Sequence, residues 1–234
     1  MELIQQAVLI LVPMILSLSV HEYAHALSAW LLGDDTAART GRLTLNPLAH
    51  MDLFGTVVMP LLAIGTGAPF FGWAKPVPVN PVRLTRRLRM KTGVLITAAA
   101  GPASNLLFAF LVAALYRALL AFGVVHLPFA LQMGVGGGAL LDGPTGALSA
   151  LMAMTFLINI GLAVFNLLPV PPLDGSRVLV GLLPDSLGRQ VEMLQRNAIF
   201  VILAFAVLIS LAGRVMAVPV LALARVLLWA TGNL

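Results

Sequence analysis

The stretch Leu3–Leu32, LIQQAVLILVPMILSLSVHEYAHALSAWLL, decides how the rest of the chain is interpreted. It is apolar and long enough to cross a bilayer, which takes about 20 mostly apolar residues. His21, Glu22 and His25 stand near its end, within five positions of one another. Ionisable side chains in a membrane helix are costly and usually serve a function. We therefore predict a membrane helix that carries a functional site.

The composition of the whole chain agrees with a membrane location. Of its 234 residues, 60% are hydrophobic and only 10% are charged, and the mean hydropathy is +1.00. A soluble domain carries roughly 25% charged residues, so this chain has too few to cover a globular surface in water. The chain has no cysteine, which excludes a disulfide framework, a cysteine–zinc site and a cysteine nucleophile. His, Asp and Glu remain as metal ligands.

Further apolar stretches predict an all-α polytopic membrane protein with about five transmembrane helices. We expect spans at about residues 92–120 and 148–168. Residues 197–231 are too long for one upright span, and we expect Gly213-Arg214 to divide them into two helices. Together the segments form a single membrane-embedded domain, 1–234, with a core at 3–175.

The region between the first two long spans is harder to assign. Part of residues 36–55 has the mixed pattern of a small strand or hairpin. Residues 53–71 are apolar but contain several Gly and Pro residues. Because non-helical backbone at membrane depth needs cover from protein or water, we expect a re-entrant or interfacial segment here. Residues 70–81 follow as an extended strip, with which an unwound substrate could pair by strand addition.

The basic residues predict the orientation in the membrane. Of the 14 Lys and Arg, all but Arg117, Arg214 and Arg225 fall in segments 33–91 and 175–196. The positive-inside rule places these segments in the cytoplasm. We expect a multi-pass protein of a bacterial cell membrane, with its site toward the cytoplasm. The net charge of +5 therefore reflects contact with the lipid bilayer, and we predict no nucleic-acid partner.

The sequence His21-Glu22-Tyr23-Ala24-His25 predicts a metal site. Residues i and i+4 share one helical face, so the two imidazoles can bind one Zn²⁺. Glu22 can then act as a general base toward a metal-activated water. The competing interpretation is a buried polar network that joins helices.

A catalytic zinc usually has three protein ligands, and Asp174 is the best candidate for the third. It follows the 148–168 span in a Pro-rich turn that ends in Gly175. The prolines end the helix and restrict the backbone, which helps to aim a carboxylate. Taken alone, this stretch is more typical of an ordinary turn.

At this point the chain resembles the site-2 protease family of intramembrane zinc metalloproteases, in its small bacterial form without a PDZ or CBS domain. Five segments carry the resemblance: His21–His25, Asn46–Gly55, Gly72–Pro81, Gly101–Asn105 and Asn166–Gly175. The resemblance implies one zinc per chain held by His21, His25 and Asp174, with Glu22 as general base. It also implies that Asn166 lies at the active site, where an amide could donate to an oxyanion. The implied activity is hydrolysis of peptide bonds in or near the transmembrane helices of single-pass membrane proteins.

Two functions from other classes remain as alternatives. The first is a metal-binding membrane transporter, which would often show internal repeats and a polar cluster on each side of the membrane. The second is an inactive scaffold that binds transmembrane helices.

Four further polar residues have less specific interpretations. His50 is a metal ligand or a residue that fixes its loop by a hydrogen bond. Asp52 is a turn or cap residue. Asn105 and Asn159 are expected to form hydrogen bonds between helices.

Overall fold

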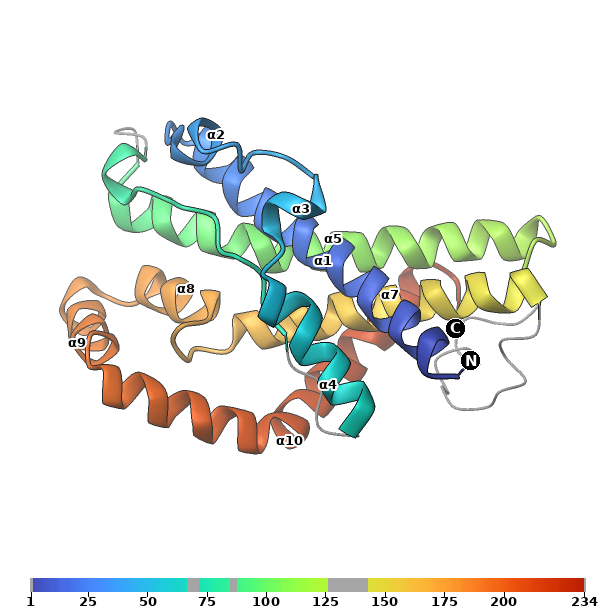
Figure 1. The fold of residues 1–234 in the computed structure, drawn as a ribbon. Coiled ribbons are helices and arrows are strands. Elements are labelled where there is room, and N and C mark those ends of the chain that lie inside the picture. The colour runs from blue at the N-terminus through green and yellow to red at the C-terminus, as the bar shows by residue number, and fades with distance from the viewer. Residues whose placement is uncertain (1, 67–71, 85–87, 126–142, 234) are drawn as a thin grey trace.

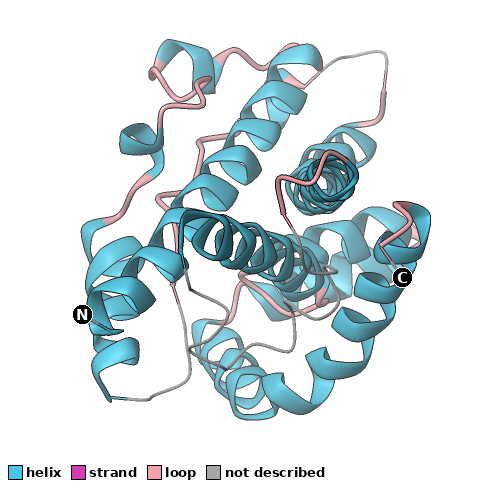
Figure 2. Cartoon of the chain, turned by 90° about the vertical axis from the view of Figure 1, so that its right-hand side faces the viewer, coloured by secondary structure: helices cyan, strands magenta, loops and turns pink. Residues whose placement is uncertain are grey.

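The computed structural model describes residues 2–66, 72–84, 88–125 and 143–233. Figure 2 shows helices and loops but no strand among these residues. Four helices are long and apolar enough to cross a membrane: α1 (Glu2–Leu31), α5 (Met90–Ala121), α7 (Gly143–Leu167) and α10 (Ala198–Ala230). The prediction of an all-α polytopic membrane protein is confirmed.

The strand or hairpin predicted within residues 36–55 is wrong. The segment forms two short helices, α2 (Thr36–Arg39) and α3 (Pro47–His50). The side chain of Asn46 accepts a hydrogen bond from the Leu48 N–H at 3.1 Å, and Pro47 occupies the first turn. An Asn cap followed by Pro favours the start of a helix, and this local preference decides the structure here.

The apolar segment that follows is short. A π-helix, η1 (Leu53–Val58), continues directly into α4 (Met59–Thr66). The predicted cap role of Asp52 is confirmed, because its Oδ1 accepts the Gly55 N–H at 2.8 Å. At six and eight residues, the two helices together fall short of the roughly 20 residues needed to cross a bilayer. The length agrees with a re-entrant or interfacial segment.

The predicted division of residues 197–231 at Gly213-Arg214 is also wrong. α10 is one helix of 33 residues, with Pro219 inside it. Figure 1 shows that its axis changes direction part-way along. A glycine in a helix costs only about 1 kcal/mol, and a proline often kinks a long helix instead of ending it. The described part of the chain therefore holds four candidate spans and one shorter apolar helix.

Three of the long helices position the site. α5 and α7 lie side by side, and α1 packs across both (Figure 1). Large buried side chains on α5, α7 and α10 form the apolar core: Tyr116, Phe156, Ile160 and Leu228. Two amphipathic helices, α8 (Asp174–Leu182) and α9 (Asp185–Gln195), connect α7 to α10. A 3₁₀ turn, η2 (Pro81–Arg83), precedes α5.

Candidate active site

Three side chains from two helices converge on one point. His21 and His25 come from α1, and Asp174 comes from the first turn of α8. The two Nε2 atoms are 3.1 Å apart, and each lies 3.2 Å from Asp174 Oδ2. In a tetrahedral zinc site with bonds of about 2.0–2.1 Å, neighbouring ligand atoms lie about 3.3 Å apart. The near-equilateral triangle therefore has the dimensions of one face of such a site.

Hydrogen bonds at the other ring nitrogens fix the tautomers. His25 Nδ1 lies 2.7 Å from the Thr97 carbonyl oxygen, which can only accept, so Nδ1 carries the hydrogen. His21 Nδ1 lies 2.6 Å from Asn105 Oδ1 and also donates. Both Nε2 atoms are then left with a lone pair directed at the triangle. A donor partner at Nδ1 is the usual arrangement of a metal-binding histidine.

The orientation of the Asn105 amide follows from its other contacts. Its Nδ2 donates to the Ser17 carbonyl at 3.3 Å and to Asn159 Oδ1 at 2.8 Å. Asn159 Nδ2 in turn donates to Ser17 Oγ and to the Thr155 carbonyl, both at 2.8 Å. A flipped Asn105 would lose these acceptors, so Oδ1 must face His21. The predicted hydrogen bonds between helices through Asn105 and Asn159 are confirmed.

The charges at the triangle favour a cation. Asp174 contributes a carboxylate oxygen to the triangle, and each histidine contributes an Nε2 atom. An ionised carboxylate and two imidazole lone pairs then meet with no hydrogen between them. These electron-rich oxygen and nitrogen atoms repel one another unless a cation lies between them. Carboxylate oxygen and imidazole nitrogen are both ligand types that Zn²⁺ accepts. The donor set therefore fits zinc.

Glu22 lies beside the two histidines but does not join the triangle. Its Oε2 accepts the backbone N–H of Val77 at 2.8 Å, and the residue is only 9% exposed. Val77 belongs to an extended segment, residues 73–80, that runs along α1. The segment is held at one end by Trp73 N–H on the Gly55 carbonyl and at the other by Asn80 N–H on Asp34. Val77 thereby holds the Glu22 carboxylate in place.

The extended segment leaves few donors for an added strand. The N–H groups of Trp73, Lys75 and Val77 bond to protein acceptors. Pro76 and Pro78 have no N–H. Among residues 73–80, the N–H groups of Ala74 and Val79 make no hydrogen bond within the described part of the chain, so pairing with a substrate strand stays a prediction.

Comparison with known proteins identifies the family. Residues 9–211, most of the chain, match the family model described as Peptidase family M50. The chain belongs to peptidase family M50. This is the site-2 protease family that the sequence resembles, so the resemblance is confirmed and the chain is a metalloprotease by family.

Relatives of this M50 chain carry matching names. It is 38% identical over 189 residues to "Putative zinc metalloprotease YwhC" of Bacillus subtilis (strain 168). The aligned region covers 81% of this chain and 74% of the relative. Proteins named Rip2 from Mycolicibacterium smegmatis and Mycobacterium tuberculosis are 31–32% identical over 172 residues. The match covers 74% of this chain but only 56% of the mycobacterial proteins. No solved structure matches the chain significantly.

The helix that carries His21 and His25 in this M50 chain packs face to face with α5. Positions 17, 21 and 25 share one face of α1, and positions 97, 101 and 105 share one face of α5. The hydrogen bonds of Asn105 and Thr97 therefore reach the two histidines from a single helix face. Gly101 lies between them, and a Cβ there would be 2.4 Å from His25 Nε2. Only glycine lets α5 come this close to the imidazoles.

A second glycine determines where Asp174 lies. A Cβ on Gly175 would be 2.2 Å from the Leu167 carbonyl oxygen and 2.4 Å from that of Leu168. These are backbone atoms with little freedom to move. Gly175 therefore allows α8 to fold back against the end of α7, which brings Asp174 to the histidines on α1.

Two other predicted residues lie elsewhere. Asn166 is on the last turn of α7, where its Nδ2 donates to the Leu162 carbonyl at 3.0 Å. Its oxyanion role stays a prediction. His50 is buried and its Nε2 donates to the Thr44 carbonyl at 2.8 Å, outside the metal-ligating group. Of the two interpretations of His50, the structure therefore agrees with the residue that fixes its loop by a hydrogen bond.

The sequence did not reveal how Asn105 and Thr97 support the histidines. Asn105 follows Gly101 by four positions, which places both on one helix face, and this spacing is the available signal. Thr97 contributes a backbone carbonyl, which any residue type could supply.

Replacing Asn105 with alanine is expected to lower zinc affinity about 10–100-fold, which is the usual effect of removing the partner of a metal-ligating histidine. His21 would lose the acceptor that fixes its tautomer. Competition with a chelator of known affinity measures the change in purified protein. Ser104→Ala is the matched control, because Ser104 bonds only within α5. Equal zinc affinity in Asn105→Ala and Ser104→Ala would contradict a supporting role for Asn105.

Proposed function

We propose that this chain is an intramembrane endopeptidase that hydrolyses peptide bonds in or near the transmembrane helices of single-pass membrane proteins. The observation that carries the proposal is the convergence of His21, His25 and Asp174 within an apolar helix bundle. His25 stands six residues before the end of α1, roughly 9 Å along the helix axis. The site therefore lies close to one membrane surface but within a predicted span.

The proposed chemistry assigns a role to each residue. His21, His25 and Asp174 would hold one zinc ion per chain. When bound, zinc polarises the scissile carbonyl and activates a water molecule for attack. Glu22 accepts the proton of that water and returns it to the leaving amine, while the Val77 N–H keeps the carboxylate oriented.

Asn166 is proposed to stabilise the oxyanion. Its Nδ2 uses one hydrogen for the Leu162 carbonyl. A primary amide has a second hydrogen, which could bind the negative oxygen that develops during attack.

We propose that the site opens toward the cytoplasm of a bacterial cell. Arg177 of α8, Arg189 of α9 and Arg196 directly after α9 lie on the side where α7 ends and α10 begins. Such basic connections remain preferentially on the cytoplasmic side. Water would then reach the site from that side.

The substrate must unwind before it can be cut. Side chains and helical hydrogen bonds shield a peptide bond within a transmembrane helix. Gly and Pro weaken a helix by about 1 and about 3 kcal/mol. We therefore expect substrates with such residues near the scissile bond.

Reconstitution with a single-pass substrate tests the proposal. The zinc-loaded chain and a substrate with two glycines in its transmembrane helix are combined in vesicles, and mass spectrometry maps the cut. We expect cleavage inside the helix or at its edge. Replacement of both glycines by leucine should slow cleavage roughly 10–30-fold, from about 0.8–1.0 kcal/mol for each glycine. Cuts confined to the soluble tails would refute intramembrane action.

A further inference from the structure

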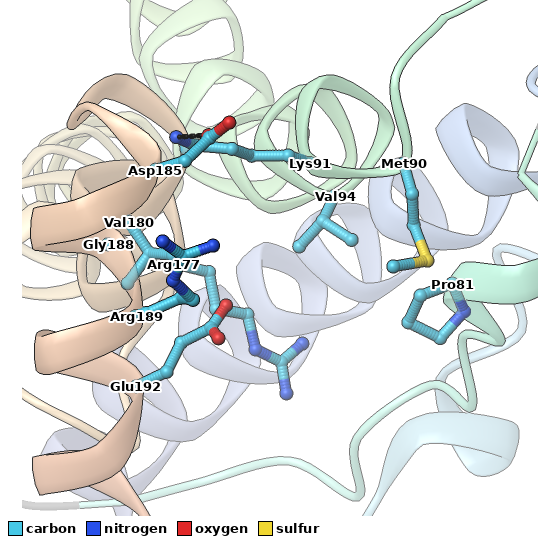
Figure 3. A pocket seen from close by; sticks show the side chains of 11 residues that line it. Pro81, Met90, Lys91, Val94, Arg177, Val180, Asp185, Gly188, Arg189 and Glu192 are labelled. Carbon is cyan, nitrogen blue, oxygen red and sulfur yellow. Dashed lines mark hydrogen bonds and ion pairs between the residues drawn. The ribbon is translucent and has the colours of Figure 1, made fainter.

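A second site lies away from the zinc ligands, between the start of α5 and the two helices α8 and α9. It is a cavity of about 410 Å³ (Figure 3). α5 begins at Met90, α7 ends at Leu167 and α10 begins at Ala198. Because three spans have their ends on this side, the cavity lies at the level of the membrane surface. Its volume is in the range of small-molecule sites, about 300–1,000 Å³.

One cation of the cavity is already paired. Lys91 donates to Asp185 at 2.9 Å and also to the Leu183 carbonyl. The hydrogen bond from Lys91 and its charge hold the pKa of the Asp185 carboxyl below its usual range. Lys91 and Asp185 therefore neutralise each other.

The other charged side chains of the cavity have no hydrogen-bonded partner, although the charge of Arg189 also helps to lower the pKa of Asp185. Arg177, Arg189 and Glu192 make no side-chain hydrogen bond or ion pair within the part of the chain that the structure describes. Together they are two basic residues and one acidic residue, with a formal net charge of +1. A guanidinium binds phosphate oxygens with two parallel hydrogen bonds. The cavity therefore favours a phosphate group with one negative charge.

The opposite wall is apolar. Figure 3 shows the side chains of Arg177, Arg189 and Glu192 on one side, and those of Met90, Val94 and Pro81 facing them. Met90 is 57% exposed although it is apolar. A cavity with one charged wall and one apolar wall suits an amphipathic occupant more than a freely soluble anion.

We propose that this cavity binds the headgroup of a singly anionic phospholipid. The phosphate would bind Arg177 and Arg189, and the first carbons of the lipid would lie against Met90 and Val94. Basic pockets at the ends of transmembrane helices are a known type of anionic-lipid site.

The occupant would act on the helix that supplies the third metal ligand. Arg177 follows Asp174 by three residues, so both lie on the same side of α8. α8 also lies close against α5, since a Cβ on Gly181 would be 2.6 Å from the Leu95 side chain. A lipid that holds Arg177 would therefore stabilise the position of Asp174. This coupling rests on the proposed function, whereas binding of the lipid does not.

Native mass spectrometry of the zinc-loaded full chain tests the proposal. The chain is placed in nanodiscs of phosphatidylcholine with increasing phosphatidylglycerol, and the lipid retained on the protein is measured. Three proteins are compared: wild type, the double variant Arg177→Gln/Arg189→Gln and the control Arg196→Gln. Arg196 is a basic residue at the end of α9 that does not line the cavity.

We expect wild type and Arg196→Gln to retain phosphatidylglycerol over phosphatidylcholine by roughly 10–30-fold, as for two basic groups near a lipid phosphate. The double variant should lose this preference. An undiminished preference in the double variant would overturn the proposal. Displacement of phosphatidylglycerol by millimolar inorganic phosphate would also overturn it, because the site would then be one for free phosphate.

Cleavage provides a separate readout of the coupling. Phosphatidylglycerol should raise the cleavage rate of wild type but not that of the double variant. An unchanged wild-type rate, with lipid binding intact, would refute the coupling alone. Absence of cleavage in every lipid would instead refute the proposed protease function, and the binding result would stand.

Discussion

Glu22→Gln is expected to lower the cleavage rate about 10²–10⁴-fold, the usual contribution of a general base, while zinc remains bound. Glutamine has the same shape but cannot accept the proton of the attacking water. Its amide oxygen can still accept the Val77 N–H, as the Glu22 carboxylate does at 2.8 Å. Glu22 is also not one of the three converging ligands. The variant should therefore keep both the fold and the metal.

Initial rates on a single-pass substrate measure this effect. Glu2→Gln is a matched control, because Glu2 is the first residue of the same helix, far from the histidines along the chain. A Glu22→Gln protein that retains more than a tenth of the wild-type rate would exclude Glu22 as the general base.

Gly101→Ala is expected to lower zinc affinity on the order of 100-fold, although it changes no ligand. The new Cβ would lie 2.4 Å from His25 Nε2 and 2.6 Å from His21 Cε1. Neither ring can move away freely, because Thr97 and Asn105 hold them by hydrogen bonds from the same helix face. In an ordinary helix position the same change would be favourable by about 1 kcal/mol.

Zinc content after purification and the unfolding temperature measure this effect separately. Gly161→Ala is the matched control, because a Cβ on Gly161 of α7 would meet no atom within 4 Å. Gly101→Ala should fold with little bound zinc, whereas Gly161→Ala should keep it. If both variants bind zinc as tightly as wild type, α5 does not approach the histidines as closely as described.

The three converging residues were all predictable from the sequence. His21 and His25 are four positions apart on a helix, and this spacing alone places them on one face. Asp174 required a different signal, the Pro-rich turn after a span. Its actual position depends on Gly175 folding α8 back against α7. That contact spans two elements, and the sequence suggests it only through resemblance to the family.

The two wrong secondary-structure predictions, for residues 36–55 and 197–231, have local causes. Residues 36–55 have a strand-like pattern, but the Asn46 cap and Pro47 start a helix instead. In α10, Gly213 looked like a helix end, but the helix continues through it and through Pro219. Single glycines and prolines are more frequent in membrane helices than in soluble ones, so they are weaker signals of a helix end in such a chain.

The most direct test of zinc-dependent proteolysis by this chain measures zinc content and cleavage rate on the same preparations of wild type, Glu22→Gln and Gly101→Ala. We expect one zinc and full cleavage for wild type, one zinc and almost no cleavage for Glu22→Gln, and little of either for Gly101→Ala. Cleavage by zinc-free protein, or equal cleavage by wild type and Glu22→Gln, would contradict zinc-dependent proteolysis with Glu22 as the general base.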